Sequence, residues 1–157
     1  MIKQRVRTRS ASLGLAAIVA LMAAPASHAS TTEAPLARAL ADATLAWGPC
    51  PDVFPAGCEI AVLHGDPAQP NADVFFKVAA GYHIPHHWHS SAERMVLVSG
   101  ELHVTYDGHP TARLQTGMYA YGPAAAPHRA DCVSSTPCVL FIAFEGPVDV
   151  QTGDRAP

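Results

Sequence analysis

The sequence of 157 residues has no internal repeats, no low-complexity tract and no pair of cysteines in C-x2-C spacing. Without repeats there is no array of small units to assemble, and the length suits one domain with a hydrophobic core. Without a C-x2-C pair, a cysteine-ligated zinc site is a poor explanation for the cysteines. The N-terminal apolar run, residues 13–24, is shorter than the roughly 20 residues that span a bilayer.

That apolar run is instead typical of a secretory signal peptide over residues 1–29. Basic residues precede it, and small residues follow it, with Ser27 and Ala29 at the −3 and −1 positions of a cleavage site. Cleavage after Ala29 is favoured; cleavage after Ala26, or an uncleaved N-terminal anchor, are the alternatives. We therefore expect export to the periplasm or the extracellular space, with no stable membrane anchor after cleavage.

Removal of the signal peptide changes the charge of the chain. The full sequence carries −3, but residues 30–157 keep six of the ten basic and all thirteen acidic residues, a net charge of −7 with histidines neutral. Such a surface does not attract nucleic acid or anionic lipid. Metal ions and neutral or cationic small molecules are the partners that this charge favours.

The four cysteines are expected to form disulfides, because an exported chain meets an oxidising compartment. Four cysteines allow three connectivities, which the sequence does not distinguish. We favour the two local pairs, Cys50–Cys58 and Cys132–Cys138, each enclosing a loop that contains proline.

The chain after the signal peptide divides into a leader, residues 30–46, one domain, residues 47–150, and a tail, residues 151–157. The leader is rich in alanine and leucine, and one reading is a short helix over residues 33–46 with Pro35 in its first turn. The alternative is a partly ordered leader that packs on the side of the domain. From Glu59 onward the pattern is β, with short runs rich in Val, Ile, Phe and Tyr. These many short strands without intervening helices predict an all-β antiparallel sandwich or barrel. The runs are EIAVL, DVFFKVA, RMVLVSG, ELHVTY, GMYAY and CVLFIAF.

Four histidines fall within the seven residues 83–89. Because side chains alternate along a strand, His87 and His89 share a face, and His86 points to the other side. Glu93 follows a short polar turn and can return to the same cavity, while His128 is the obvious fourth donor from a later strand. Imidazoles with a carboxylate suit a divalent transition metal. A histidine cluster on the surface without metal is the alternative.

These residues carry a specific resemblance. The segment GYHIPHHWHSSAERMVLVSG is similar to the first cupin motif, G-x5-H-x-H-x3-E-x6-G, at every defined position. The segment GMYAYGPAAAPHRADC resembles the second motif, G-x5-P-x-G-x2-H-x3-N, with Ala125 in place of Gly and Cys132 in place of Asn. From about Trp47 to Pro147 the chain looks like a family of small exported bacterial cupins of unassigned function.

The resemblance implies an all-β, double-stranded jelly-roll barrel that holds one divalent transition metal through His87, His89, Glu93 and His128. Iron, manganese or zinc are the expected metals, and nickel and copper also accept such a donor set. Ala125 stands where the motif has glycine, and alanine tolerates a positive φ poorly, so a turn that needs a positive φ would be strained at this position. The family also suggests dimerisation through edge strands.

Several other side chains are expected to lie outside the metal site. His83 and His86 are expected at the pocket mouth or on the surface, Trp88 in barrel packing, and Arg94 facing away from Glu93. Tyr119 and Tyr121 are read either as pocket-lining or as packing residues. Solvent-facing positions without a role are predicted for His64, His103 and His109.

Three functions remain open. The first is a metal-dependent enzyme acting on a small organic molecule, in the manner of an oxygenase, with no catalytic residue assigned beyond the metal ligands. The second is a non-catalytic periplasmic module that binds or senses a small molecule. The third is a stress-related interaction protein with a vestigial barrel. Cupins host many unrelated chemistries, so the fold alone does not separate them.

Overall fold

The computed structural model describes residues 33–153, which contain ten β-strands and no helix. The predicted signal peptide, residues 1–29, lies outside the described residues. The strands are β1 (Trp47–Pro49), β2 (Cys58–His64), β3 (Asp73–Val78), β4 (His83–His87), β5 (Glu93–Ser99), β6 (Glu101–Tyr106), β7 (Ala112–Gln115), β8 (Tyr119–Gly122), β9 (His128–Cys132) and β10 (Cys138–Phe144). The predicted all-β class is confirmed.

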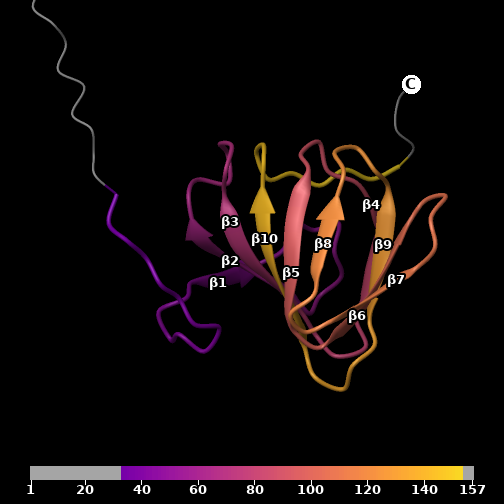
Figure 1. The fold of residues 1–157 in the computed structure, drawn as a ribbon, viewed down its shortest axis with the longest axis horizontal. Coiled ribbons are helices and arrows are strands. Elements are labelled where there is room, and N and C mark those ends of the chain that lie inside the picture. The colour runs from indigo at the N-terminus through magenta and orange to yellow at the C-terminus, as the bar shows by residue number, and fades with distance from the viewer. Residues whose placement is uncertain (1–32, 154–157) are drawn as a thin grey trace, which may run out of the picture. The chain divides into compact units, whose positions relative to one another are not determined.

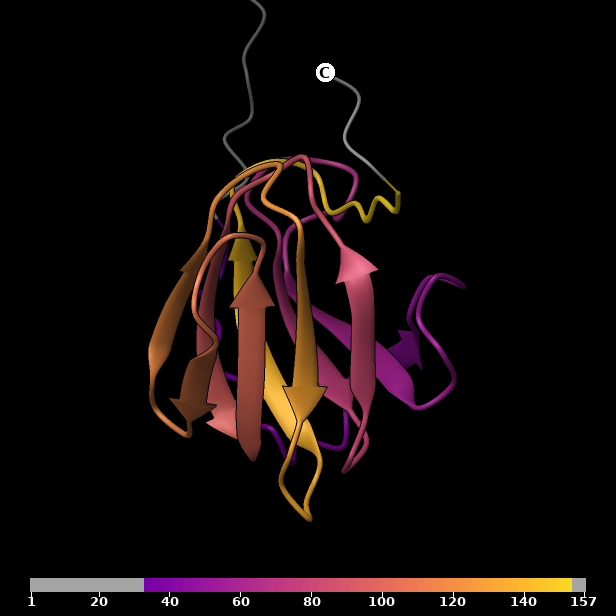
Figure 2. The ribbon, with the colours of Figure 1, turned by 90° about the vertical axis from the view of Figure 1, so that its right-hand side faces the viewer.

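The strands from residue 47 onward form two antiparallel sheets that face each other (Figures 1 and 2). The six-stranded sheet has the order β1-β2-β3-β10-β5-β8, and the four-stranded sheet has the order β4-β9-β6-β7. Consecutive strands such as β4 and β5 therefore belong to different sheets. This double-sheet arrangement is the jelly roll that the sequence predicted.

The core lies between the sheets and is built from alternating positions. On β6, Leu102 and Val104 are buried, whereas His103 on the other face, which was predicted to face solvent, is half-buried. The central strand β10 lies between β3 and β5, and five of its seven side chains are buried. The largest fully buried side chains include Val74, Val78, Leu97 and Leu102.

The short helix expected over residues 33–46 is wrong. Residues 33–36 are exposed and have no regular structure, and residues 37–46 form only turns before β1. One oxygen of the Asp42 side chain accepts hydrogen bonds from Thr44 N, at 2.8 Å, and from Thr44 Oγ1, at 2.7 Å. Such local bonds from a side chain to the backbone compete with a helix, and they prevail here over the propensity of the alanines.

Both expected disulfides are present. Cys50 pairs with Cys58 and Cys132 pairs with Cys138, with Cα–Cα distances of 5.5 and 5.8 Å. The first bond closes the loop between β1 and β2, and the second closes the loop between β9 and β10. In the part of the chain that the structure describes, no helix is long and apolar enough to cross a membrane.

Candidate metal centre

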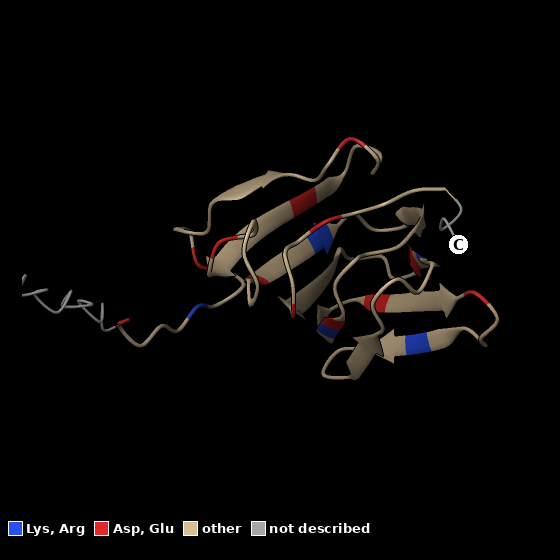
Figure 3. Ribbon diagram, turned by 90° about the horizontal axis from the view of Figure 1, so that it is seen from above, with Lys and Arg blue, Asp and Glu red and all other residues tan. Residues whose placement is uncertain are grey.

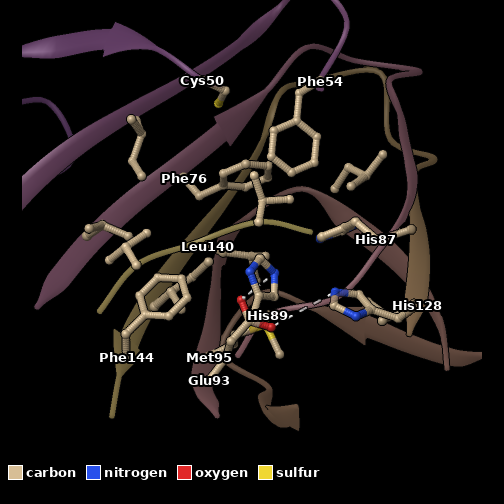
Figure 4. A pocket seen from close by; sticks show the side chains of 18 of the residues that line it. Cys50, Phe54, Phe76, His87, His89, Glu93, Met95, His128, Leu140 and Phe144 are labelled. Carbon is tan, nitrogen blue, oxygen red and sulfur yellow. Dashed lines mark ion pairs between the residues drawn. The ribbon is translucent and has the colours of Figure 1, made fainter. Parts of the chain in front are cut away.

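The four side chains predicted to bind metal come from both sheets and meet between them (Figure 4). His87 is the last residue of β4 and His128 the first of β9, and the two are direct cross-strand partners. His89 lies two residues beyond β4. Glu93 is the first residue of β5, in the opposite sheet. We call these four residues the histidine–glutamate cluster.

Donor atoms of the three imidazoles in the cluster all lie within 4.8 Å of one another. The Glu93 carboxylate reaches two of the rings: Oε1 is 3.4 Å from His89 Nε2, and Oε2 is 3.9 Å from His128 Nε2. All four side chains are buried, whereas the neighbouring His86 is exposed and pairs with Asp107. The alternation predicted for residues 86–89 thus holds in space.

Each imidazole of the cluster is held by a backbone carbonyl at Nδ1. His87 Nδ1 donates to the carbonyl of Pro85 at 2.7 Å, His128 Nδ1 donates to the carbonyl of Ala126 at 3.0 Å, and His89 Nδ1 donates to that of Asp149. A carbonyl oxygen can only accept, so Nδ1 carries the proton and Nε2 keeps its lone pair. This is the arrangement that orients histidines as metal ligands.

Burial disfavours charge on every member of the cluster. It lowers the pKa of His87 to about 3, with a further contribution from the nearby His128, and it lowers the pKa values of His89 and His128. Burial also raises the pKa of Glu93 to about 7, against the opposing effect of His128. The imidazoles are therefore neutral at pH 7, and a divalent cation fits this set of three nitrogens and one carboxylate.

The cluster lies at one end of an apolar cavity of about 110 Å³. Phe54, in the loop closed by the Cys50–Cys58 disulfide, contacts the edge of the His87 ring, with ring centroids 5.1 Å apart. Phe54 also meets Phe76 of β3 edge to face, at 5.9 Å between centroids. In Figure 4 these aromatic rings lie on one side of the cavity, and the carboxylate of Glu93 lies on the other.

The remaining predicted residues lie outside this cavity. Tyr119 and Tyr121 are 59% and 51% exposed on the edge strand β8, so the reading that they line the pocket is wrong: their side chains point away from the barrel. Arg94 faces away from Glu93 and pairs with Glu145, as expected. Trp88 is half-buried. His64, His83 and His109 are exposed, and His103 is half-buried against Glu101.

Several residues of the site were not found from the sequence. Asp149 contributes a backbone carbonyl, which no residue type signals. Phe54 lies in an irregular loop without a periodic pattern. Tyr106 stacks obliquely on His128 at 4.7 Å between centroids and lines the cavity. The alternation of β6 places Tyr106 on the same face as Leu102 and Val104, but alternation alone does not assign it to the site.

Ala125 occupies the position where the second cupin motif has glycine, and its φ is +57°. That is the left-handed region, which suits glycine better than alanine. The Ala125 N–H donates to the carbonyl of His89 at 2.7 Å, so the strained turn contacts the segment that carries a member of the cluster. The turn therefore keeps the positive φ that suits the glycine of the motif, and Ala125 adopts this φ with strain.

Comparisons with known proteins agree with this architecture. Residues 74–144 match the family model of the Cupin domain. The DMSP lyase DddQ from Ruegeria pomeroyi is 22% identical, with a TM-score of 0.56 over 67% of this chain. An RmlC-like cupin from Shewanella frigidimarina is also 22% identical, with a TM-score of 0.55 over 67% of this chain and 86% of its own. A search of curated proteins finds no match.

A third similar structure is the oxalate decarboxylase of Bacillus subtilis, a protein with Mn(II) centres. It is 24% identical, with a TM-score of 0.53 over 60% of this chain and 27% of its own. This chain likewise spans less than two thirds of the Ruegeria lyase, 58% of its length. At such identities the likeness establishes the shared fold.

Proposed function

Residues 74–144 match the family model of the Cupin domain, and we propose that this chain is a cupin and an exported, metal-dependent enzyme that acts on a small organic molecule. The observation that carries the proposal is the set of three buried imidazoles, each fixed at Nδ1 by a carbonyl so that its Nε2 keeps a lone pair within the cluster. Burying polar groups costs free energy, so three such rings beside a carboxylate need a compensating partner. A divalent cation supplies one.

His87, His89, His128 and Glu93 would hold this cation, and Fe(II), Mn(II) or Zn(II) suits the donors. The Mn(II) centres of the similar Bacillus subtilis oxalate decarboxylase support this range of metals. When bound, such a metal polarises an oxygen-bearing substrate or, in the case of iron, supports chemistry with dioxygen. Four protein donors leave positions for the substrate in a six-coordinate ion.

The protein would contribute orientation and a dry environment. The carbonyls of Pro85, Ala126 and Asp149 fix the imidazoles before the substrate arrives, which lowers the cost of organising the site. The apolar walls exclude water and hold the body of the substrate beside the cluster. Two disulfides support an exported protein, because such bonds persist in oxidising compartments.

A non-catalytic binding or sensing module is the second function, and one observation favours it. Among the described cavity-lining residues outside the cluster, the only titratable side chains are Tyr106 and Asp149. The Asp149 carboxylate already accepts hydrogen bonds from Ser90 N, at 2.9 Å, and from Gln151 Nε2, at 3.0 Å. The site therefore has few groups for proton transfer besides the proposed metal ligands.

The experiment that tests the proposal begins with the metal content of protein purified without a histidine tag, measured by mass spectrometry. About one equivalent of iron or manganese, followed by oxygen uptake with one of a panel of small organic acids and alcohols, supports the enzyme. Bound metal with tight ligand binding and no turnover supports the sensing module. No metal, even after anaerobic reconstitution, overturns the enzyme and leaves a binding or structural barrel.

A further inference from the structure

We infer that the ligand of this cavity is a small molecule with one oxygen-bearing head group and a compact, uncharged, apolar body. The inference rests on the proposed function, because the head group is assigned to the metal held by the histidine–glutamate cluster. It goes further by excluding ligands with a second charge. Three features of the cavity lead to it: the distribution of polar groups, the placement of charges, and the size of the cavity.

The polar groups of the cavity are gathered at one end. The imidazoles and the carboxylate of the histidine–glutamate cluster lie together where β4, β5 and β9 begin or end. The hydroxyl of Tyr106, which is buried without a hydrogen-bond partner, belongs to the same end, because it and the Glu93 carboxylate both approach Gly122. The walls that extend away from this end are aliphatic or aromatic, so a second polar group placed there would lose its water without gaining a partner. These apolar walls include Ile60, Val74, Phe76, Ile84, Leu102 and Leu140.

No lysine or arginine lines the cavity within residues 33–153. Of the five cationic side chains there, Arg38, Lys77 and Arg94 are paired with acids, and Arg113 and Arg129 are exposed. Figure 3 shows these cations at a few separate places along the ribbon. A second carboxylate or a phosphate on the ligand would therefore be buried without a counter-charge, which is strongly unfavourable.

A cationic group on the ligand body would be equally unmatched. Glu93 belongs to the cluster, and the other acid at the cavity, Asp149, already accepts two hydrogen bonds from Ser90 and Gln151. The part of the cavity away from Glu93 offers the side chains of Phe76 and Ile60, and Phe54 contacts both His87 and Phe76. The body of the ligand is accordingly uncharged at the end away from its head group.

The cavity is open to solvent, and its volume of about 110 Å³ indicates a small ligand body. An apolar cavity of roughly 150 Å³ binds benzene, so this one suits about one ring or a short branched chain. The aromatic pair Phe54 and Phe76, with centroids 5.9 Å apart, provides edges and faces that favour a planar ring. A benzoate-like monoanion is the simplest probe of this class.

Three probes of matched shape separate charge from size: benzoate, 4-methylbenzoate and terephthalate. Terephthalate and 4-methylbenzoate have similar length, but only terephthalate places a second carboxylate at the far end. We expect the metal-loaded protein, followed by isothermal titration calorimetry, to bind 4-methylbenzoate at least 100-fold more tightly than terephthalate. Acetate, which has the head group without the body, should bind at least tenfold more weakly than benzoate.

A positive charge placed at the far end should weaken this preference. Ile60 lies on β2, three strands from the β5 strand that carries Glu93, or about 14 Å at the usual strand spacing. The variant Ile60→Lys should bind terephthalate at least tenfold more tightly than the parent protein does. The matched variant Ile60→Met keeps an apolar side chain of similar volume and should keep the parent preference.

The outcomes separate this inference from the proposed function. Metal content is measured on every sample used for titration. A protein that retains no metal overturns the proposed function and this inference with it. Metal-loaded protein that binds terephthalate as tightly as 4-methylbenzoate overturns this inference alone. The parent protein supplies this comparison even if Ile60→Lys fails to fold.

Discussion

His89 and Asp149 lie sixty residues apart in the chain, and the Nδ1–H of His89 donates a hydrogen bond to the backbone carbonyl of Asp149. The Asp149 carboxylate in turn accepts from the backbone N–H of the residue after His89, Ser90, at 2.9 Å. Two bonds thus connect the segment after β10 to the segment that carries His89. Gln151 extends this connection by pairing with Trp88 through backbone bonds of 3.0 and 2.9 Å.

Replacing Asp149 by alanine should weaken metal binding without removing a ligand. The substitution removes the bond to Ser90 and loosens the carbonyl that orients His89. Loss of such supporting contacts typically costs about 10–100-fold in metal affinity. Competition with a chelator of known affinity measures the change. Asp131→Ala, which removes an exposed acid paired with His83, is the control and should leave the affinity unchanged.

The residues of the cluster could be predicted from the sequence, because histidine and glutamate side chains occur at a spacing that matches both strand alternation and the cupin motifs. His87 and His89 are buried and His86 is exposed, as a period of two requires. The contribution of Asp149 was invisible, since a backbone carbonyl carries no residue signature. The helix over residues 33–46 was predicted from propensity, which the local hydrogen bonds of Asp42 overrode.

The same alternation predicts which histidines are needed for metal. His87→Ala and His128→Ala should each abolish stoichiometric metal, because each removes one of three imidazoles grouped within 4.8 Å. His86→Ala should retain full metal content, since that ring lies on the surface beside Asp107. Mass spectrometry of the purified variants measures the content. An empty His86→Ala protein together with a loaded His87→Ala protein would contradict the assignment.

Metal affinity should fall at acidic pH because of Glu93. Burial raises the pKa of this carboxyl to about 7, so below pH 7 a proton must leave before the carboxylate can bind. Affinity should drop about tenfold per pH unit below 7 and level off above it. Burial lowers the pKa of His87 to about 3 and also lowers the pKa values of His89 and His128, so these rings carry less proton near neutrality than a free histidine does.

Calorimetry of metal binding in buffers of different ionisation enthalpy counts the released protons directly. At pH 6, about one proton per metal is expected from Glu93, whose pKa burial raises to about 7. Glu93→Gln is the matched control, because it keeps the shape and cannot ionise, and its weaker metal binding should lose this pH dependence. Release of two or three protons would show that the histidines titrate near neutrality and would contradict the effect of burial.

The strained Ala125 predicts a stabilising substitution. An alanine held at φ +57° destabilises the folded protein by about 1–2 kcal/mol relative to glycine. Glycine has an opposite effect of about 0.4–1 kcal/mol, because it increases the conformational entropy of the unfolded chain. Ala125→Gly should therefore raise the free energy of unfolding by about 0.5–1 kcal/mol in urea titrations. The neighbouring Ala126 lacks a positive φ, so Ala126→Gly should lower stability by a similar amount. Destabilisation by both substitutions would argue against strain at Ala125.

The two disulfides should differ in their effect on the cavity although they close loops of similar length. Replacing either pair by serine should cost about 2–3 kcal/mol in the chain-entropy model, because the cysteines are eight and six residues apart. Only the Cys50–Cys58 loop carries Phe54, which contacts His87 across the cavity. Cys50→Ser with Cys58→Ser should therefore weaken binding of 4-methylbenzoate at least fivefold. Cys132→Ser with Cys138→Ser should leave that affinity unchanged under conditions where both proteins are folded, and equal losses in the two variants would mean that Phe54 does not form the cavity wall.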